Sequence, residues 1–506
     1  MERSIARPEA QAPRRLARGW AWVKHEPGLW VVLALYAASR AAYEALGVKF
    51  DIKWASDYGM HLLAPDLLKN DLWRSIFYLH GQPPLFNLFY AAILRLFPND
   101  NALGFQISYW ILGVVLAISL YILLRRLRVQ GAIAAVLTAI FMLGSSEIFY
   151  ETRGFYEHLD VTLLVLTALL FEEYFHTKKT GFLLGTFTAF AAIVLVRTTF
   201  HLVWMVAGLA LVLFFDWKNR RKVLLVFAIP FLIAAGWYAK NYFVFGQFTA
   251  STWTGMNMGR ISTYMLTHDL RDPLIQQGKI SDLARLASIF DYRLDQHQEI
   301  KTGIPALDEV YKSPGNYNYN NINVIPFSQQ LLKDAFTVIR LYPKNYLFYI
   351  YDATMLYFKQ SSYFYTYTDT PPALLEWEKI DQAIYYEPWF PLKGGQANSP
   401  SAPVRFGLVV LAHVNLIMVG YLLAIGLGGA YLVRSVLRRD PTNPRQPVIV
   451  FLVFMLVYIS VVSNVAEIQM NYRFRYMADP FLWVLTGLGL SWVWGQVSKR
   501  MARKEI

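Results

Sequence analysis

Long apolar runs recur along most of this chain, and they constrain its fold more than any other feature. A helix that crosses the hydrocarbon core of a bilayer needs about 17–25 mainly apolar residues. Ten segments meet or approach this length: about 28–46, 102–124, 130–149, 159–175, 182–196, 199–215, 223–239, 405–433, 447–464 and 480–496. We therefore predict an all-α polytopic membrane protein with about ten transmembrane helices.

The composition agrees with a membrane protein. Hydrophobic residues make up 55% of the 506 residues and charged residues only 16%, whereas soluble domains carry about 25% charged residues. The formal charge of +13 comes from basic residues that bunch at the ends of apolar runs, so it indicates membrane orientation and not nucleic-acid binding. The absence of cysteine excludes a disulfide framework and thiolate chemistry.

The basic clusters also orient the chain. Segment 83–97 is apolar but only fifteen residues long, which is short for a span. If it lies on the outer surface as a juxtamembrane helix, every basic cluster falls on the inner side, as the positive-inside rule requires. We therefore place both termini in the cytoplasm. The high Arg and Ala content near the N-terminus favours a bacterial inner membrane over the endoplasmic reticulum.

This topology predicts the domain organisation. Residues 28–239 form an N-terminal transmembrane catalytic core with a first outer loop at 47–101, and residues 240–404 form an extracytoplasmic, mainly helical cap. The C-terminal transmembrane helices lie at 405–496, between cytoplasmic tails at 1–27 and 497–506. Almost all unusual polar residues fall on the outer side, so the active site is expected there, out of reach of cytosolic nucleotide sugars and ATP.

The first outer loop is rich in acids. Asp51 and Asp57 lie between a span and the juxtamembrane helix, with His61 and His80 further along. A carboxylate held near the membrane surface can act as a general base toward a hydroxyl group. The alternative is that these acids are solvated loop residues and helix caps.

Basic residues mark the start of the last span. Arg473 and Arg475, next to Tyr476, suit a phosphate head group, because arginine stays charged and donates paired hydrogen bonds to phosphate oxygens. The alternative is that they are interfacial anchors or partners of Glu467. Arg197 and the adjacent pair Lys240 and Asn241 would line the same cavity as this phosphate head group. A lysine at this depth commonly snorkels to the surface instead.

The predicted outer tip at 150–158 gathers acids, an arginine and a histidine into nine residues. Glu151, Tyr156, Glu157 and His158 would bind sugar hydroxyls, or a divalent ion through the Glu and His side chains. The alternative is a loop whose charges neutralise one another in solvent.

Several of these stretches resemble one superfamily. Asp57, followed by a helix-like stretch and HGQPPLFNLFYAAILRLF, resembles the first external loop of GT-C glycosyltransferases, which include the protein O-mannosyltransferases and the lipid A aminoarabinose transferases. Asp57-Tyr58 stands where the family has an Asp-Glu pair. The second carboxylate is therefore missing, and whether this chain has the family's metal site is an open question. Segments 149–175, 236–260 and 467–490 extend the resemblance, which covers roughly residues 28–260 and 405–496.

The resemblance implies an inverting glycosyltransferase that moves a sugar from a polyprenyl-phosphate carrier to a lipid, glycan or protein acceptor. It implies Asp57 as the catalytic base, with Asp51 as second choice. The phosphate would be bound by Arg473, Arg475, Arg197 and Lys240. Substrate contacts would come from His80, Glu151, Tyr156, Glu157, His158, Asn241, Glu467 and Tyr476, and a divalent metal is an open possibility.

Two alternatives come from other classes. A lipid or glycan transporter or flippase also needs charges between spans, but transporters place their sites near the midplane, whereas the unusual charges here gather at one surface. A non-catalytic scaffold of an envelope-assembly complex would be expected to lose residues such as Asp57 and Arg473, which this chain keeps.

Overall fold

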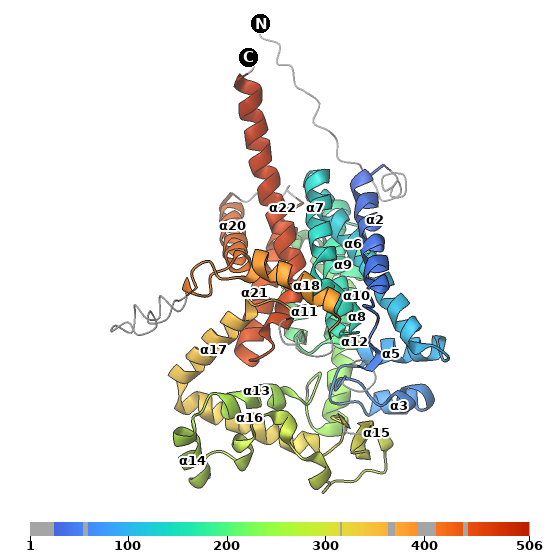
Figure 1. Ribbon diagram of the computed structural model, residues 1–506, viewed down its shortest axis with the longest axis vertical. Helices are drawn as coiled ribbons and strands as arrows, with labels where there is room; N and C mark the ends of the chain where they lie inside the picture. Colours follow the sequence, from blue (N-terminus) through green and yellow to red (C-terminus); the bar gives the residue numbers. More distant parts are fainter. Residues whose placement is uncertain are drawn as a thin grey trace.

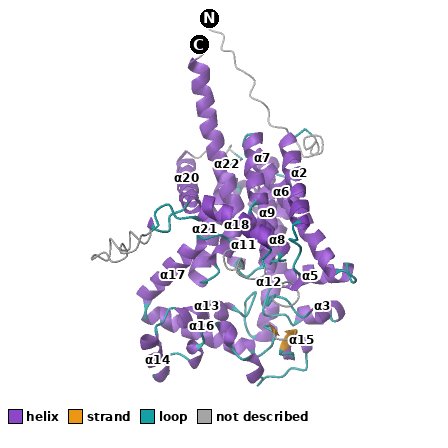
Figure 2. Ribbon diagram, in the orientation of Figure 1, coloured by secondary structure: helices purple, strands orange, loops and turns teal. Residues whose placement is uncertain are grey.

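The computed structural model describes residues 25–53, 59–313, 316–362, 370–391, 411–438 and 444–504. Within these ranges nearly all regular structure is helical (Figure 1), and Figure 2 shows strands only in one small hairpin, β1 (Tyr311–Ser313) with β2 (Asn316–Tyr317). The predicted all-α class is confirmed for the described part of the chain.

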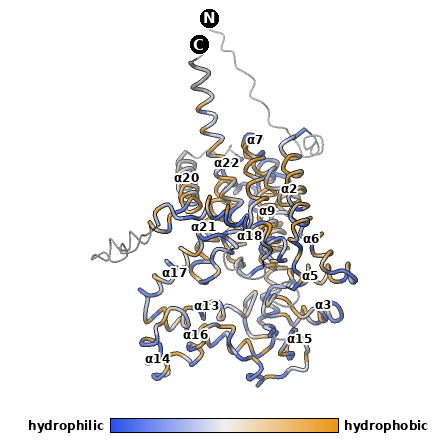
Figure 3. Tube along the Cα trace, viewed as in Figure 1, coloured by the Kyte–Doolittle hydropathy of each residue, from blue (hydrophilic) through white to orange (hydrophobic). Residues whose placement is uncertain are grey.

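Helix α9 (Tyr156–Thr177) is the centre of a helix bundle. It packs against α6 (Asn101–Arg126), α10 (Thr180–Val196), α21 (Gln446–Ala466) and α22 (Asn471–Lys504). Around them lie α2 (Pro27–Ala45), α7 (Gly131–Leu143), α8 (Ser145–Thr152), α11 (Leu202–Phe215), α12 (Arg220–Phe245) and α20 (Leu416–Arg438). Figure 3 shows apolar residues concentrated in this bundle, where one large hydrophobic cluster joins helices from both ends of the sequence.

As far as their residues are described, nine of the ten predicted spans each fall on one helix, and the span 130–149 covers α7 and part of α8. Among the described residues, three helical stretches are long and apolar enough to cross a membrane by themselves: Asn101–Arg126, Trp217–Phe245 and Gln446–Ala466. The bent pair of α7 and α8, which turns by 51°, gives a fourth if it acts as one span. The chain is therefore a multi-pass helical membrane protein, but ten spans are not confirmed.

The predicted juxtamembrane segment is helix α5 (Pro84–Leu96), which begins with proline in its first turn. Proline suits this position because its missing N–H would have no partner within the helix. The helix packs against α6, α10 and the short α3 (Pro65–Asn70). Helix α5 therefore joins the first loop to the bundle. That it lies along the membrane surface remains a prediction.

The cap begins where α12 ends, at Gly246, whose φ of 73° suits glycine because it has no Cβ. Its centre is a pair of helices, α13 (Thr254–Tyr264) and α16 (Val324–Leu341). A Cβ at Gly255 would lie 1.6 Å from the Ser328 carbonyl oxygen, so only glycine permits this close approach. The pair lies at the opposite end of the molecule from the C-terminal part of α22 (Figure 1).

Other cap elements surround this pair. They are α14 (His268–Gln276), η4 (Asp282–Arg285), η5 (Ile289–Asp291), η6 (Leu294–Gln296) and α15 (Pro305–Asp308). The chain returns to the bundle through α17 (Pro343–Tyr357), which packs against α21 and α22, and α18 (Pro372–Asp381), which packs against α8. The five-residue turn Gln382–Tyr386 follows α18.

Helix α18 is fastened to the break between α7 and α8. Asp381 accepts hydrogen bonds from the Ser145 backbone N–H at 2.7 Å and from its hydroxyl at 2.6 Å. Trp377 donates to the Leu143 carbonyl at 2.7 Å. These contacts satisfy backbone groups that a broken helix leaves without partners, so the cap holds the bend in place.

Candidate functional site

A cavity of about 590 Å³ lies where the helix bundle meets the cap. Its size is within the range of small-molecule sites. Its walls come from the first outer loop, the start of α9, the end of α10, the turn between α21 and α22, and the cap elements α13, η5, β1 and β2. Its charged residues are Arg197, Arg260, Lys312, Arg473 and Glu467, so the wall carries more positive than negative charge.

Two of its arginines share one carboxylate. Glu157 Oε1 lies 3.0 Å from Arg197 Nη1 and 2.5 Å from Arg473 Nη2. Glu157 itself is fully buried. A second carboxylate oxygen, Asp160 Oδ2, lies 3.9 Å from Arg197 Nη1. The carboxylate thus joins the end of α10 to the start of α22 through α9, and it orients both guanidinium groups at the bundle side of the cavity.

Aromatic rings hold the same arginines in place. Arg197 lies between the rings of Tyr156 and Phe474, at 4.5 Å and 4.4 Å from their centroids. The Tyr156 hydroxyl accepts a hydrogen bond of 2.9 Å from Arg473 Nη2. Planar guanidinium groups stack well on aromatic faces while keeping their edges available for hydrogen bonds. Tyr156 and Phe474 therefore help to fix a rigid pair of cations.

The cap contributes two further basic residues. Arg260 of α13 pairs with Glu467 and donates to the Ile468 carbonyl at 2.6 Å, which ties the cap to the turn between α21 and α22. Lys312 of β1 donates to the Gly59 carbonyl at 2.6 Å and so reaches the first outer loop. The spacing of these two residues in the sequence gives no sign of either contact, since both depend on how the cap docks.

The two predicted bases differ in what the structure describes. Asp57 lies outside the described residues. Asp51 forms an ion pair with Arg153, and its backbone N–H donates to the Thr152 carbonyl at 2.8 Å. Asp51 does not line the cavity. Its contacts fasten the first loop to the turn before α9.

The predicted substrate residue His80 is buried between the first loop and the cap. Its Nδ1 lies 2.7 Å from Thr252 Oγ1 and its Nε2 lies 2.9 Å from the Asn320 carbonyl oxygen. A carbonyl oxygen only accepts, so the ring proton is on Nε2. Burial, with the charge of Lys240, lowers the His80 pKa to about 3. His80 thus joins loop to cap and does not line the cavity.

Lys240 and Asn241 are also engaged within the protein. Lys240 Nζ donates to the Leu79 carbonyl and to Asn241 Oδ1, each at 2.6 Å, and lies 3.6 Å from the centroid of the Trp237 ring. Asn241 in turn donates to the Thr249 carbonyl at 2.8 Å. Both side chains close the junction where α12 enters the cap, outside the cavity.

Arg475 lies apart from Arg473. It is fully buried, and its Nη1 donates to both oxygens of Asp479 at 2.7 Å. Its other nitrogens donate to the carbonyl oxygens of Tyr357 and Lys359, to Ser361 Oγ and to the Tyr386 hydroxyl. All of these partners belong to the protein, so Arg475 fastens α22 to the returning cap segment.

A candidate cation site lies inside the bundle, where Glu147 meets two residues of the predicted tip at 150–158. Glu147, Glu151 and His158 bring three potential ligand atoms within 4.8 Å of one another. Glu147 Oε1 is buried without a hydrogen-bond partner among the described residues and lies 3.5 Å from His158 Nδ1. Tyr476 donates to the other oxygen of Glu147. This group could hold a metal ion.

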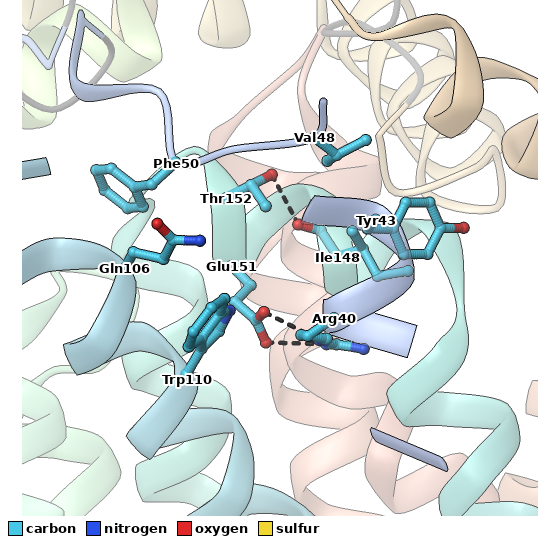
Figure 4. A pocket seen from close by; sticks show the side chains of 9 residues that line it. All are labelled: Arg40, Tyr43, Val48, Phe50, Gln106, Trp110, Ile148, Glu151 and Thr152. Atoms are coloured by element: carbon cyan, nitrogen blue, oxygen red, sulfur yellow. Dashed lines mark hydrogen bonds and ion pairs between the residues drawn. The ribbon is translucent and has the colours of Figure 1, made fainter. Parts of the chain in front are cut away.

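One of these ligands is already engaged. Both oxygens of Glu151 accept hydrogen bonds of 2.9 Å from Arg40 (Figure 4), and Oε2 also accepts one of 2.8 Å from the Tyr36 hydroxyl. The fixed positive charge of Arg40 repels a second cation, and Glu151 would have to leave it to bind a metal. The donor set therefore fits a divalent ion poorly, and no step of the proposed reaction passes through one.

His61, which had no role assigned from the sequence, lines the cavity. Its ring contacts the Tyr156 ring edge-on at 4.7 Å and lies 5.8 Å from the Trp253 ring. Burial lowers its pKa well below the usual value, and the charges of Arg473, Arg197 and Lys312 add to this effect. Its position in the sequence, four residues after the predicted base Asp57, was the available signal that His61 lies near the site.

Comparison with known proteins identifies no family for this chain. No family model and no curated protein matches the sequence. A solved structure with detectable similarity is the crystal structure of ArnT from Cupriavidus metallidurans in the apo state. It is 13% identical, with a TM-score of 0.31, over 94% of this chain and 77% of that chain.

Proposed function

We propose that this protein transfers a sugar from a polyprenyl-phosphate carrier to an acceptor hydroxyl in the cavity between the helix bundle and the cap. The observation that carries the proposal is the pair Arg197 and Arg473, held at the bundle side of a cavity of about 590 Å³. A lipid-linked phosphate approaching along the membrane helices needs cations at this place. The cap would lie on the extracytoplasmic side of a bacterial plasma membrane.

The phosphate is expected between Arg197 and Arg473. Besides Glu157, the Tyr156 hydroxyl and the Met470 sulfur accept hydrogen bonds from Arg473, and the Met477 sulfur accepts one from Arg197. Sulfur is a weak acceptor, so phosphate oxygens would replace the two sulfur contacts. Arginine binds phosphate oxygens through paired, charge-assisted hydrogen bonds. The two arginines also stabilise the negative charge that builds up on the phosphate oxygen as the sugar leaves.

The reaction is a single displacement. The acceptor oxygen attacks the anomeric carbon, and the bond between that carbon and the phosphate oxygen breaks. The bonding electrons stay on the polyprenyl phosphate, and the acceptor proton passes to the base. One displacement inverts the configuration at the sugar carbon.

Asp57 is our candidate for the base, since Gly59 and His61, which follow it closely in the sequence, line the cavity. The acceptor hydroxyl, from a lipid, glycan or protein, would approach from the cap wall. There the amide side chains of Asn257 and Asn316 and the rings of Trp253 and Tyr319 line the cavity.

The test is donor binding and sugar transfer by the purified full-length protein. Arg197→Ala and Arg473→Ala should each weaken binding of a labelled polyprenyl-phosphate sugar by about ten-fold or more, because charge-assisted hydrogen bonds contribute about 1.5–3 kcal/mol. The matched control is Arg285→Ala on the cap surface, where Arg285 pairs only with exposed acids among its described contacts.

Three results would count against the proposal. Wild-type protein that binds no polyprenyl-phosphate sugar would remove the donor class. Normal binding in both cavity variants would remove Arg197 and Arg473 as its ligands. Movement of the lipid-linked sugar across the membrane without transfer would identify a transporter instead.

A further inference from the structure

The loop that carries His61 is fixed by the neighbouring helix α5. The fully buried Asn87 donates from Nδ2 to the His61 carbonyl at 3.1 Å, and its Oδ1 accepts from the Leu63 N–H at 2.8 Å. One amide thus holds the backbone on both sides of Leu62. The imidazole is therefore positioned at the cavity before any ligand arrives, which lowers the entropy cost of binding.

The ring lies among cations and aromatic side chains. Arg473 of α22, Arg197 after α10 and Lys312 of β1 all act on His61, and Tyr156 of α9 and Trp253 before α13 contact its ring. Protonation would add a further positive charge to this wall, so the imidazole stays neutral. A neutral imidazole offers one acceptor nitrogen and one donor nitrogen.

One of these nitrogens is unsatisfied. Among the described residues, no group forms a hydrogen bond with His61 Nδ1, although this atom is buried. A buried polar atom without a partner costs about 1–3 kcal/mol, and such atoms in native proteins call for an explanation. A ligand that supplies the missing partner would recover this cost.

We propose that His61 recognises a hydroxyl group of the sugar that is joined to the phosphate. This inference rests on the proposed function, since it takes the phosphate to lie at Arg197 and Arg473. The Tyr156 ring that His61 contacts edge-on at 4.7 Å also lies 4.5 Å from the Arg197 guanidinium, and its hydroxyl accepts from Arg473, so the first sugar ring falls beside the imidazole. A sugar hydroxyl both donates and accepts, and it fits a neutral imidazole better than a charged one. His61 is then a residue that determines sugar specificity, and a donor lacking this hydroxyl binds more weakly.

The experiment compares two lipids on three variants of the full-length protein. The lipids are a polyprenyl-phosphate sugar and the same polyprenyl phosphate without its sugar. The variants are His61→Phe, which removes both nitrogens, His61→Asn, which keeps a polar group, and His297→Asn as control. His297 is an exposed cap histidine that stacks on Tyr292 and does not line the cavity.

We expect His61→Phe to weaken binding of the sugar-bearing lipid about ten-fold, the size of one hydrogen bond of about 1.4 kcal/mol. Binding of the bare polyprenyl phosphate should not change. His61→Asn should recover part of the loss, and His297→Asn should behave as wild type. Because the ring stays neutral, wild-type affinity for the sugar-bearing lipid, a phosphodiester, should be flat between about pH 5.5 and 8.

Other results overturn the inference in distinguishable ways. If wild type binds the bare lipid and the sugar-bearing lipid equally well, the cavity does not read the sugar, although a phosphate site stands. If His61→Phe weakens the binding of both lipids equally, or the binding of neither, His61 has no role in sugar recognition. If wild type binds neither lipid, the proposed function itself fails.

Discussion

Arg473 and Glu157 form a buried ion pair of 2.5 Å that joins α22 to the start of α9, although 316 positions separate them in the sequence. The same carboxylate oxygen of Glu157 also lies 3.0 Å from Arg197. The one close carboxylate is shared by two guanidinium groups and neutralises each only in part, and the buried Asp160 lies further off, 3.9 Å from Arg197. This arrangement suits a ligand that brings its own negative charge.

The shared carboxylate predicts a stability effect. Glu157→Gln removes the carboxylate that pairs with both buried guanidinium groups and leaves only the more distant Asp160, 3.9 Å from Arg197. Loss of one partner of a buried pair typically costs about 3–5 kcal/mol. We expect the melting temperature of the detergent-purified variant to be lower than that of wild type. Polyprenyl phosphate should raise the melting temperature of the variant by more than it raises that of wild type. Glu376→Gln, at an exposed pair with Lys379, is the control and should change little. An unchanged melting temperature in Glu157→Gln would show that the ion pair does not stabilise the bundle.

Arg475 should behave differently from Arg473, two positions away. Arg475→Ala leaves the buried Asp479 unpaired, so we expect a loss of about 3–5 kcal/mol of unfolding free energy. Donor affinity of the fraction that remains folded should be close to that of wild type. The measurements are thermal unfolding and donor binding at a temperature where the variant is folded. A stable Arg475→Ala protein that has lost donor binding would show that Arg475 binds the phosphate, as the sequence predicted.

Asp57→Asn tests the base. The substitution keeps the shape of the side chain but removes its basic oxygen. A positioned base contributes typically 10²–10⁴-fold, so transfer of a labelled sugar should fall by about that factor while donor binding survives. Asp51→Asn should affect stability more than transfer, because Asp51 pairs with Arg153. Near-normal turnover in a well-folded Asp57→Asn protein would remove it from the mechanism.

His80 predicts a pH dependence of stability. Its folded-state pKa of about 3 lies below the unfolded value of about 6.5. Below pH 6.5 the unfolded chain therefore takes up a proton that the folded chain does not, and stability falls with falling pH. The expected contribution is a loss of about 2 kcal/mol between pH 7 and pH 5. His80→Gln should remove this contribution from the unfolding free energy measured at the two pH values; an unaltered pH slope would contradict the assignment.

Metal removal should have little effect. Arg40 occupies both oxygens of Glu151, so we expect chelation to leave sugar transfer and melting temperature unchanged. Elemental analysis of the purified protein checks this directly. Stoichiometric metal that is lost in Glu147→Gln would show that Glu147 and His158 hold an ion despite the neighbouring arginine.

The apolar runs were sufficient to locate the helices of the bundle. Hydrophobic length is a local property, so every predicted span falls on helical segments, with 130–149 divided between α7 and α8. A proline marks the start of α5 and a glycine follows the end of α12. The first residues of the last helix were less evident. Residues 471–479 contain two arginines and an aspartate, so their low hydropathy hid that α22 already begins at Asn471.

The roles of the charged residues depended on tertiary structure. Once α22 includes Arg473 and Arg475, residues two apart on a helix point to different sides, so one lines the cavity and the other binds Asp479. The sequence by itself determined which segments are apolar helices and which residue types are available for chemistry. Only the packing of α9, α10, α22 and the cap decided which charges meet, because ion pairs and cavities form between segments that are distant in the chain.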